Sequence, residues 1–365
     1  MDVISNESSS SLSDSCDTSQ EDVSERRGKR KATAAAGARP SSKRKRSSYL
    51  KVIEKGIKKV TIKETTKETK EETKKVTIKE TKNGITKETI KESKQDLRVD
   101  ALRAEFQAKY QQQNLLGAGG CGSVFAGYCR ADKLPVAIKY IPKDKVLCKH
   151  VDKNGRQLSV EVAIMLKLAG TSAPVSLLDW YDLDLELIVV MERPVPAVDL
   201  AEYIKVSGGS LSEEKAKIIL KQLVDAAKEL EDKHIFHRDI KVENILIETG
   251  SDVPRVRLID FGLGCFVKKR SLYSVFYGTL AHVPPEWNSH YAYRAGASTV
   301  WQMGVVLFDS LHGQIHFETT KFLTKELRIK TNLSKDCQDF LQSCLSKAPE
   351  QRPTLDQLRL HPWLR

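Results

Sequence analysis

The stretch that decides the fold is His237-Arg238-Asp239-Ile240-Lys241-Val242-Glu243-Asn244, and sixteen residues after Asn244 comes Asp260-Phe261-Gly262. Phosphoryl transfer needs little covalent chemistry from a protein. A carboxylate orients the attacking hydroxyl, and oxygen ligands hold Mg²⁺ against the phosphates. Asp239 is the candidate for the first role, and Asn244 and Asp260 for the second. Lys241 can neutralise charge on the phosphate in transit. Asp239 and Asp260 could be ordinary turn residues. Chance is a poor explanation, however, for both segments occurring in this order and at this distance.

A glycine-rich segment lies upstream, and its sequence is Leu115-Leu116-Gly117-Ala118-Gly119-Gly120-Cys121-Gly122-Ser123-Val124-Phe125. Glycines let a backbone approach phosphates closely and adopt conformations closed to other residues. The same G-x-G-x-x-G pattern occurs in dinucleotide-binding turns, which continue into a helix. Here residues 124–128 predict a strand instead. We therefore expect a loop that joins two strands and covers a nucleotide.

The next strand is predicted at Pro135-Val136-Ala137-Ile138-Lys139-Tyr140-Ile141, and it contains V-A-I-K. A lysine in a strand usually faces solvent, but one that follows a glycine loop by a single strand favours a phosphate ligand. Its orienting partner should be a Glu on the following helix. The apolar spacing in residues 157–168 predicts that helix, and it contains Glu161. The alternative is that Glu161 is a solvated surface residue.

The remaining pattern is that of two strands, a break and a run of helices. Residues 175–180 and 185–191 predict strands, and Glu192-Arg193-Pro194-Val195-Pro196 predicts a connecting hinge in which Pro194 has no N–H to donate. Helices are expected at 200–206, from Ser212 to about residue 234, and at 297–312, 334–346 and 354–360. Glu286 is expected to pair with Arg352 in a structural contact.

Composition indicates a sizeable core and an uneven charge. The 365 residues are 40% hydrophobic and 30% charged, which allows one large or two ordinary domains. The net charge is +12, of which residues 1–100 contribute +8 through 25 Lys+Arg and 17 Asp+Glu. Seven scattered cysteines without a C-x-x-C pair argue against a disulfide framework or zinc site. With no signal-like or membrane-spanning run, we expect an intracellular protein of the nucleus, the cytoplasm or both, without a membrane partner.

Residues 1–95 have the composition of a disordered, basic, low-complexity extension. Two basic clusters, at 26–31 and 43–46, resemble a two-part nuclear-import signal, so residues 26–46 are expected to bind import receptors. The alternative is a solvated basic tail with incidental nucleic-acid affinity. Residues 58–65 recur as 74–81, and this spacing of 16 matches none of the common solenoid repeats. Residues 97–110 predict a short amphipathic lead-in.

Together these motifs resemble the protein kinase family over residues ~105–365. Within it, the chain is similar to the Pim group of serine/threonine kinases. The resembling residues are Leu177-Leu178-Asp179-Trp180, Glu192-Arg193-Pro194-Val195-Pro196, Asp199-Leu200, Val283-Pro284-Pro285-Glu286-Trp287 and Val300-Trp301. The resemblance implies an α+β, bilobal fold. Its parts are a β-rich N-lobe at about 105–192, a hinge at 192–198 and a mainly helical C-lobe at 199–365.

The resemblance also implies ATP and Mg²⁺ as cofactors and assigns the site residues. Catalytic roles fall to Asp239, Lys241 and Asn244, and metal binding to Asn244 and Asp260. Met191 is the implied gatekeeper. The implied ATP-binding residues are Leu116, Gly117, Ala118, Gly119, Gly120, Cys121, Gly122, Val124, Ala137, Lys139, Glu161, Met191, Glu192, Leu246 and Asp260.

Pim-like kinases prefer substrates with Arg or Lys ahead of the target residue, and the positions matching their selecting acids are Asp199, Glu202 and Glu243. Val242 occupies a position that is usually acidic, which weakens the expected preference. Lys241 and Thr279 match the Ser/Thr-specific class. The group also implies activity without phosphorylation of the activation segment, residues 263–283.

Three departures from the family pattern stand out. The first is the long basic, repetitive N-terminal extension, which is not part of a typical Pim kinase. Cys121 replaces the usual aromatic residue at the tip of the glycine loop. It is either a reactive thiol over the nucleotide or a small residue without a role. Thr299 stands where most kinases carry an Asp that ties down the catalytic loop, and Pim-like members lack that Asp too.

The sequence thus predicts a monomeric, ATP-dependent serine/threonine kinase that phosphorylates basic, Arg/Lys-rich proteins. The alternative is a binding protein without catalysis. Such a protein would be a kinase-fold scaffold, or a nucleic-acid- or chromatin-associated protein that uses the basic tail.

Overall fold

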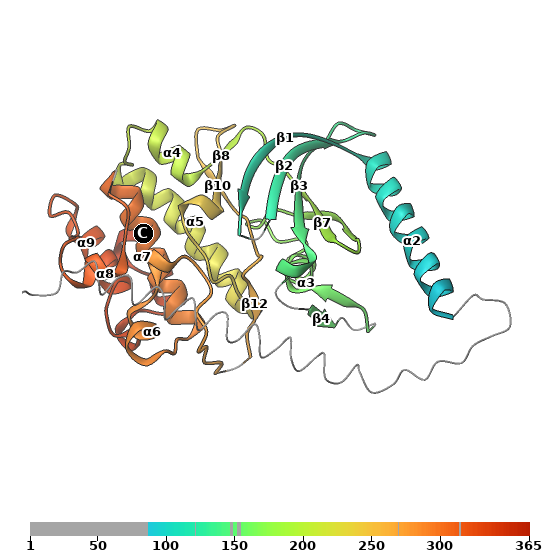
Figure 1. The fold of residues 1–365 in the computed structure, drawn as a ribbon. Helices are drawn as coiled ribbons and strands as arrows, with labels where there is room; N and C mark the ends of the chain where they lie inside the picture. The colour runs from blue at the N-terminus through green and yellow to red at the C-terminus, as the bar shows by residue number, and fades with distance from the viewer. Residues whose placement is uncertain (1–86, 121, 147–148, 152–154, 269, 314) are drawn as a thin grey trace, which may run out of the picture. The chain divides into compact units, whose positions relative to one another are not determined.

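The computed structural model describes residues 87–365 apart from 121, 147–148, 152–154, 269 and 314. The predictions for the basic clusters, the 16-residue repeat and Cys121 lie outside these described residues. The predicted α+β, bilobal architecture is confirmed. A sheet-rich small lobe and a helical large lobe follow one another along the chain, as Figure 1 shows.

The small lobe is built on a five-stranded antiparallel sheet with the order β1-β2-β3-β7-β6. These strands are β1 (Tyr110–Gly119), β2 (Gly122–Cys129), β3 (Pro135–Pro142), β6 (Leu177–Asp182) and β7 (Glu186–Glu192). A two-stranded sheet pairs β4 (Lys149–Val151) with β5 (Gln157–Ser159), and helix α3 (Val160–Lys167) follows directly. The glycine-rich segment therefore joins two strands, as predicted.

Side chains of β3 alternate between two apolar layers, because successive residues of a strand point to opposite faces. Val136 and Ile138 are fully buried in a cluster on one face. Ala137 and Ile141 pack into the main core on the other. Lys139 shares the face of Ala137, so the alternation turns its ammonium toward the large lobe and away from solvent.

Helix α3 begins later than the sequence predicted. The apolar spacing indicated a helix over 157–168, but residues 157–159 pair with β4 as strand β5. Ser159 ends the strand and caps the helix, because its hydroxyl accepts a hydrogen bond from the Val162 N–H at 3.2 Å. Glu161 consequently lies in the first turn of α3, where its carboxylate also suits the helix dipole.

Helix α2 (Lys87–Lys109) covers part of the small sheet ahead of β1. It begins ten residues before the predicted lead-in and lies against β6 and β1 (Figure 1). Phe106 is 6% exposed, and its ring meets Tyr140 and Tyr181 edge-on at centroid distances of 6.3 and 5.4 Å. The helix therefore adds an aromatic layer to the sheet face that is opposite Lys139.

The large lobe contains two small antiparallel sheets. Strand β10 (Ile245–Glu248) lies between β8 (Ala197–Asp199) and β11 (Arg255–Leu258), and β9 (Ile235–Phe236) pairs with β12 (Cys265–Phe266). Its helices are α4 (Leu200–Val206), α5 (Glu213–Asp232), α6 (Pro285–His290), α7 (Ala295–His312), α8 (Thr319–Leu323), α9 (Lys335–Cys344) and α10 (Leu355–Arg359). Short 3₁₀ segments include η2 (Val242–Asn244) and η3 (Leu280–His282).

Two helices form the framework for the catalytic segments. Helix α5 starts as predicted, with the Ser212 hydroxyl accepting from the Lys215 N–H, and buries an apolar stripe that includes Ile219 and Leu223. In helix α7 every residue from Ser298 to His312 is buried, and only its first turn is accessible. It packs against α5 and contacts η2. Across the described part of the chain, no helix has the length and apolar character that a membrane span requires.

Candidate active site

Lys139 joins the two lobes through a pair of carboxylates. Its Nζ lies 2.6 Å from Glu161 Oε1 and 2.8 Å from Asp260 Oδ1. Burial works to lower the pKa of Lys139, but these two carboxylates outweigh it and raise the pKa. Burial raises the pKa of Glu161 and the Lys139 ammonium opposes that effect. At 2.6 Å the Lys139 ammonium and the Glu161 carboxylate form an ion pair, so Lys139 is held as a cation beside Asp260.

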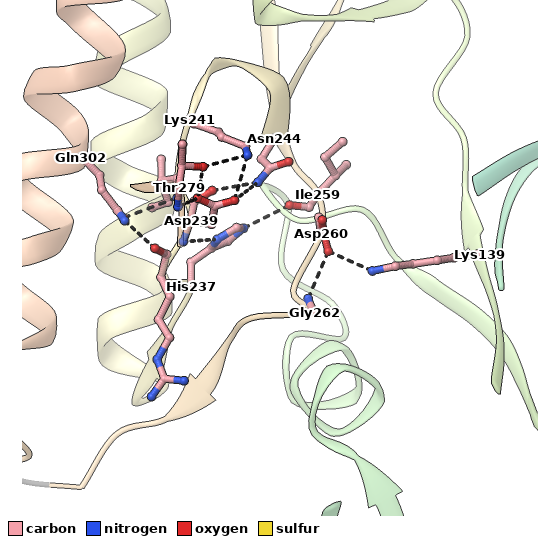
Figure 2. A network of polar contacts seen from close by, with 12 residues as sticks. Lys139, His237, Asp239, Lys241, Asn244, Ile259, Asp260, Gly262, Thr279 and Gln302 are labelled. Carbon is pink, nitrogen blue, oxygen red and sulfur yellow. Dashed lines mark hydrogen bonds and ion pairs between the residues drawn. The ribbon is translucent and has the colours of Figure 1, made fainter. Parts of the chain in front are cut away.

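Asp260 is held in a conformation that few non-glycine residues adopt. Its φ is 62°, and its Oδ1 accepts a hydrogen bond from the Gly262 N–H at 3.2 Å. Burial works to raise the pKa of Asp260, but Lys139 and the Gly262 N–H outweigh it, so the pKa is lowered. The carboxylate is therefore charged at neutral pH, and it points toward Lys139 in Figure 2.

The Asp239 carboxylate is surrounded by donors. Its Oδ1 accepts from the N–H and the hydroxyl of Thr279 at 2.8 and 2.7 Å. Its Oδ2 lies 3.0 Å from Lys241 Nζ and 3.2 Å from Asn244 Nδ2. Lys241 also donates to the Thr279 hydroxyl at 2.9 Å. Figure 2 shows these four side chains converging from the catalytic loop and the activation segment.

His237 supports this loop from below. Its Nδ1 accepts from the Asp239 N–H at 3.4 Å, so the proton sits on Nε2, which donates to the Ile259 carbonyl at 3.0 Å. Burial lowers the pKa of His237, which keeps this tautomer neutral. The imidazole thus links the residue before Asp260 to the backbone of Asp239.

The Arg238 guanidinium lies between two aromatic rings of the activation segment. Its Cζ is 4.9 Å from the ring centroids of both Tyr273 and Tyr277. Its Nη1 donates to the Leu263 carbonyl at 3.5 Å. Cation–π contacts of this kind hold an arginine without a carboxylate or a phosphate. We call this group the Arg238 clamp.

The glycine loop contains one glycine that the fold itself requires. Gly122 has φ +136°, and a Cβ there would lie 2.1 Å from the Tyr140 carbonyl oxygen. At Gly117, Gly119 and Gly120 a Cβ would meet nothing within 4 Å. Leu116 and Ala118 are exposed, while Val124 pairs with Lys139 across β2 and β3. The loop is therefore open over the strand that carries Lys139.

The end of β7 leads into the predicted hinge. Met191 is 7% exposed and stands opposite Ala137, and Glu192 is the last residue of the strand. Arg257 forms ion pairs with Glu192 and with Glu248. Leu246 is partly buried against the main core, opposite Asp199 on β8. Of the predicted ATP-binding residues, Ala137, Met191 and Glu192 thus lie on the paired strands β3 and β7, and Leu246 lies on β10 of the large lobe.

The predicted substrate-selecting acids lie on β8, α4 and η2, which contact one another. Asp199 caps α4, with its Oδ1 accepting from the Glu202 N–H at 2.8 Å. Glu202 pairs with Lys205 on the surface at 2.8 Å. Glu243 lies close enough to influence the charge of Asp309 on α7. Val242 is only 4% exposed, so its side chain belongs to the core and not to a substrate surface.

The activation segment is anchored by the predicted Glu286–Arg352 contact. Arg352 donates from Nη1 and Nη2 to the two Glu286 oxygens at 2.9 and 2.6 Å. The Arg352 side chain is fully buried, and its guanidinium lies 4.9 Å from the Trp301 ring centroid. This bidentate pair lies apart from the Lys139 cluster and has a structural role.

The donor set fits Mg²⁺ and a nucleotide. Among the described residues, Asn244 uses its Nδ2 for hydrogen bonds and Asp260 uses its Oδ1. Asn244 Oδ1 and Asp260 Oδ2 remain as hard oxygen ligands, and Mg²⁺ characteristically binds one or two protein oxygens and completes its shell with phosphate and water.

Sequence analysis missed two polar residues near the site. Gln302 and Asp309 both lie on α7 and are buried at 6% and 7% exposure. Gln302 bonds to the catalytic loop, and Asp309 Oδ1 accepts from the Phe317 N–H at 2.7 Å. The available signal was their polarity within a buried helix that is mostly apolar.

Comparisons with known proteins agree with this geometry. The model of the protein kinase domain family matches residues 110–364. The chain is 36% identical over 287 residues to the zebrafish (Danio rerio) serine/threonine-protein kinase pim-2, which covers 74% of this chain and 91% of that protein. It is 34% identical over 269 residues to the Caenorhabditis elegans serine/threonine-protein kinase prk-2, covering 72% of this chain and 59% of that protein. Mouse (Mus musculus) sperm motility kinase 3A is 30% identical over 264 residues, or 70% of this chain and 50% of its own length. The chain belongs to the protein kinase family, and within it resembles the Pim serine/threonine kinases.

Proposed function

We propose that this protein uses Mg²⁺-bound ATP to phosphorylate Ser or Thr in basic protein substrates. The observation that carries the proposal is the Lys139 cluster, in which a small-lobe lysine contacts Asp260 of the large lobe at 2.8 Å. This contact brings the candidate phosphate ligand within hydrogen-bond distance of the candidate metal ligand. The Asp239 network lies beside it in Figure 2.

Each residue then has a role that its contacts allow. The bound nucleotide supplies the phosphoryl group, with its charge partly neutralised by metal ions. Lys139 directs a fixed positive charge at phosphate oxygens. Asp239 orients the substrate hydroxyl, and Lys241 lies 3.0 Å from Asp239 to balance negative charge. Asn244 and Asp260 hold the metal through their remaining oxygens.

The preference for basic substrates rests on the acids of α4 and η2. Asp199 uses Oδ1 as the helix cap, so its Oδ2 can accept from a guanidinium. Glu202 on α4 and Glu243 on η2 add carboxylates from neighbouring elements. Because Val242 is buried, one of the positions that is acidic in the Pim group makes no contribution here. We therefore propose a preference for basic peptides that is weaker than that of the group.

We also propose activity without phosphorylation of the activation segment. A phosphate there would ordinarily serve to pair with an arginine next to the catalytic aspartate. Here the Arg238 clamp makes that connection with two tyrosine rings. The activation segment is further attached by the Thr279–Asp239 hydrogen bonds.

The test is phosphotransfer to a randomised peptide library by full-length protein, its Asp260→Asn variant and the surface control Asp182→Asn. The parent and the control should phosphorylate Ser and Thr peptides enriched in Arg and Lys, and Asp260→Asn should show no transfer while remaining folded. Equal transfer by the parent and Asp260→Asn would refute the metal site. Binding of Mg-ATP without transfer to any peptide would favour the scaffold alternative.

A separate proposal concerns the two basic clusters within residues 26–46. They lie outside the described residues, so this proposal rests on the sequence alone. We propose that they bind nuclear import receptors and direct the protein to the nucleus. Substituting both clusters with Ala should move a fluorescent fusion out of the nucleus. If the distribution is unchanged but salt-sensitive DNA binding is lost, the clusters form a nucleic-acid-binding tail instead.

A further inference from the structure

The backbone around Asp239 is held by a side chain that arrives from α7. Gln302 is 6% exposed, and its Nε2 donates to the Arg238 carbonyl at 2.6 Å. Its Oε1 accepts from the Ile240 N–H at 3.4 Å, the longer and weaker of the two contacts. One amide thus bonds the residue before Asp239 and the residue after it.

The backbone of residues 238–240, to which Gln302 is hydrogen-bonded, needs support from outside the loop. Arg238 has φ 72°, a left-handed conformation that is strained for a non-glycine residue. Gly278 approaches the same carbonyl from the activation segment, because a Cβ there would lie 2.8 Å from the Arg238 oxygen. The Arg238 carbonyl is therefore enclosed between Gly278 and Gln302, and its direction sets the plane of the peptide that leads into Asp239.

The chemistry of the contact selects an amide. A carbonyl needs a donor and an N–H needs an acceptor, and the Gln302 amide presents the two on separate atoms of one neutral group. A carboxylate at residue 302 could accept from Ile240 but would face the Arg238 oxygen with another lone pair. Thr299, one turn earlier on α7, lines a cavity of about 150 Å³ together with His237 and Ile240, so its short hydroxyl leaves space beneath the loop.

We propose that Gln302 is the positioning residue for Asp239, fixing the catalytic loop to α7 through a neutral amide. The inference rests on the proposed kinase activity and deepens it. Gln302 acts through the Arg238–Asp239 peptide and does not touch substrate. Because the Lys139 cluster has no contact with Gln302 among the described residues, loss of the amide should lower kcat and leave nucleotide binding intact.

The experiment compares the full-length parent with Gln302→Leu, Gln302→Glu and the control Ser298→Ala. Ser298 is buried on the same helix, and its hydroxyl has no hydrogen-bond partner in the described part of the chain. Gln302→Leu should lower kcat 10- to 100-fold, since a misplaced catalytic group costs about that much. The KM for ATP should stay within threefold, and Ser298→Ala should match the parent. Amide hydrogen exchange at Ile240 should accelerate in Gln302→Leu alone.

Gln302→Glu supplies a pH readout that a merely structural role would not produce. Its carboxyl is buried, so its pKa should be raised. The protonated form can donate to the Arg238 carbonyl as Gln302 does, whereas the carboxylate cannot. Relative to the parent, kcat of Gln302→Glu should therefore rise several-fold as pH falls from 8 to 5.5. This variant also carries the test if Gln302→Leu fails to fold.

Three results would overturn the inference. They are an unchanged kcat in folded Gln302→Leu, an equal loss in Ser298→Ala, and a flat pH ratio for Gln302→Glu. The activity of the parent in the same assay reports separately on the proposed function. An inactive parent whose Ile240 amide exchanges faster in Gln302→Leu would refute the activity and retain the Gln302 contact.

Discussion

Two buried ion pairs hold this molecule together in different ways. In the Lys139 cluster, the ammonium is shared by Glu161 at 2.6 Å and Asp260 at 2.8 Å. Below the activation segment, Arg352 meets the two Glu286 oxygens through two parallel hydrogen bonds. Both cations are buried, so charge and burial do not separate the two sites. The geometry of the cation does.

An ammonium is a point charge with rotatable donors, whereas a guanidinium is a rigid fork. Lys139 can turn from a carboxylate to a phosphate oxygen without losing its other partner. Arg352 is fixed by Glu286, by the Ser346 and Ala297 carbonyls and by the face of Trp301. Lys139, which must serve a ligand, is thus held by contacts that it can exchange. Arg352, which must hold a segment, donates from every nitrogen of its guanidinium. Exchanging the two residue types tests this difference.

The largest expected effect comes from Lys139→Arg. The positive charge is kept, so Glu161 and Asp260 stay compensated and the free energy of unfolding should change by about 1 kcal/mol or less. The bulkier fork cannot place its charge where the ammonium was, and losing one such electrostatic contact lowers kcat by about a thousandfold. Steady-state phosphotransfer and thermal unfolding measure the two quantities. Lys143→Arg, at an exposed ion pair with Asp182, is the matched control.

The reciprocal change, Arg352→Lys, should do the opposite. The ammonium keeps one bond to Glu286 and loses the second, together with at least one carbonyl contact. Charged hydrogen bonds contribute about 1.5–3 kcal/mol each, so we expect about 3 kcal/mol of lost stability with little change in activity per folded molecule. Denaturant unfolding measures the loss. Arg359→Lys, whose partner Asp225 is half exposed, should cost under about 1 kcal/mol. A comparable loss at both positions would erase the distinction.

How much of this could be predicted from the sequence follows from the range of each interaction. Lys139, Asp239 and Asp260 lie in local motifs whose residue spacing is itself the signal, and in the structure Lys139 Nζ lies 2.8 Å from Asp260 Oδ1. The predicted start of α3 was wrong because Ser159 is the last residue of a strand that pairs with β4. Strand pairing depends on residues in another segment of the chain, so a local pattern does not reveal it. Gln302 was missed because its partner Arg238 is 64 residues away. Which polar residue of a buried helix faces a loop depends on how that helix packs.

Another buried carboxylate sharpens the comparison, since within the described residues Asp309 is bonded to a backbone N–H in place of a cation. Burial raises the pKa of Asp309 to about 6. The folded state therefore binds this proton more tightly than the unfolded chain, and its contribution to stability falls as pH rises from about 4 to 6. Asp309→Asn removes the effect, so its stability relative to the parent should increase by roughly 2 kcal/mol between pH 4 and 7. Unfolding at several pH values checks this, and a pH-independent difference would contradict it.

The aromatic layer under α2 tests whether neutral contacts follow a different rule from the ion pairs. Phe106→Leu keeps most of the apolar area but loses the edge contacts to Tyr140 and Tyr181. We expect about 1.5 kcal/mol of lost stability, independent of salt. Leu97→Ala, on the same helix but 70% exposed, should have almost no effect. Equal stability of all three proteins would show that α2 adds nothing to the small lobe.

The smallest expected effect lies at the Arg238 clamp, where a cation is held by rings alone. Each ring contact of this kind contributes about 0.5–1 kcal/mol at partly exposed sites, far less than a bidentate carboxylate. Tyr277→Leu should therefore lower kcat only a few-fold, because Tyr273 and the Leu263 carbonyl still hold the guanidinium. Tyr277→Phe keeps the ring and should match the parent, which separates the ring face from the hydroxyl. If Tyr277→Leu were inactive until a phosphate was added to the activation segment, the clamp would be the element that replaces phosphorylation. A loss shared by Tyr277→Phe would instead assign the effect to the hydroxyl and remove the cation–π contact from the account.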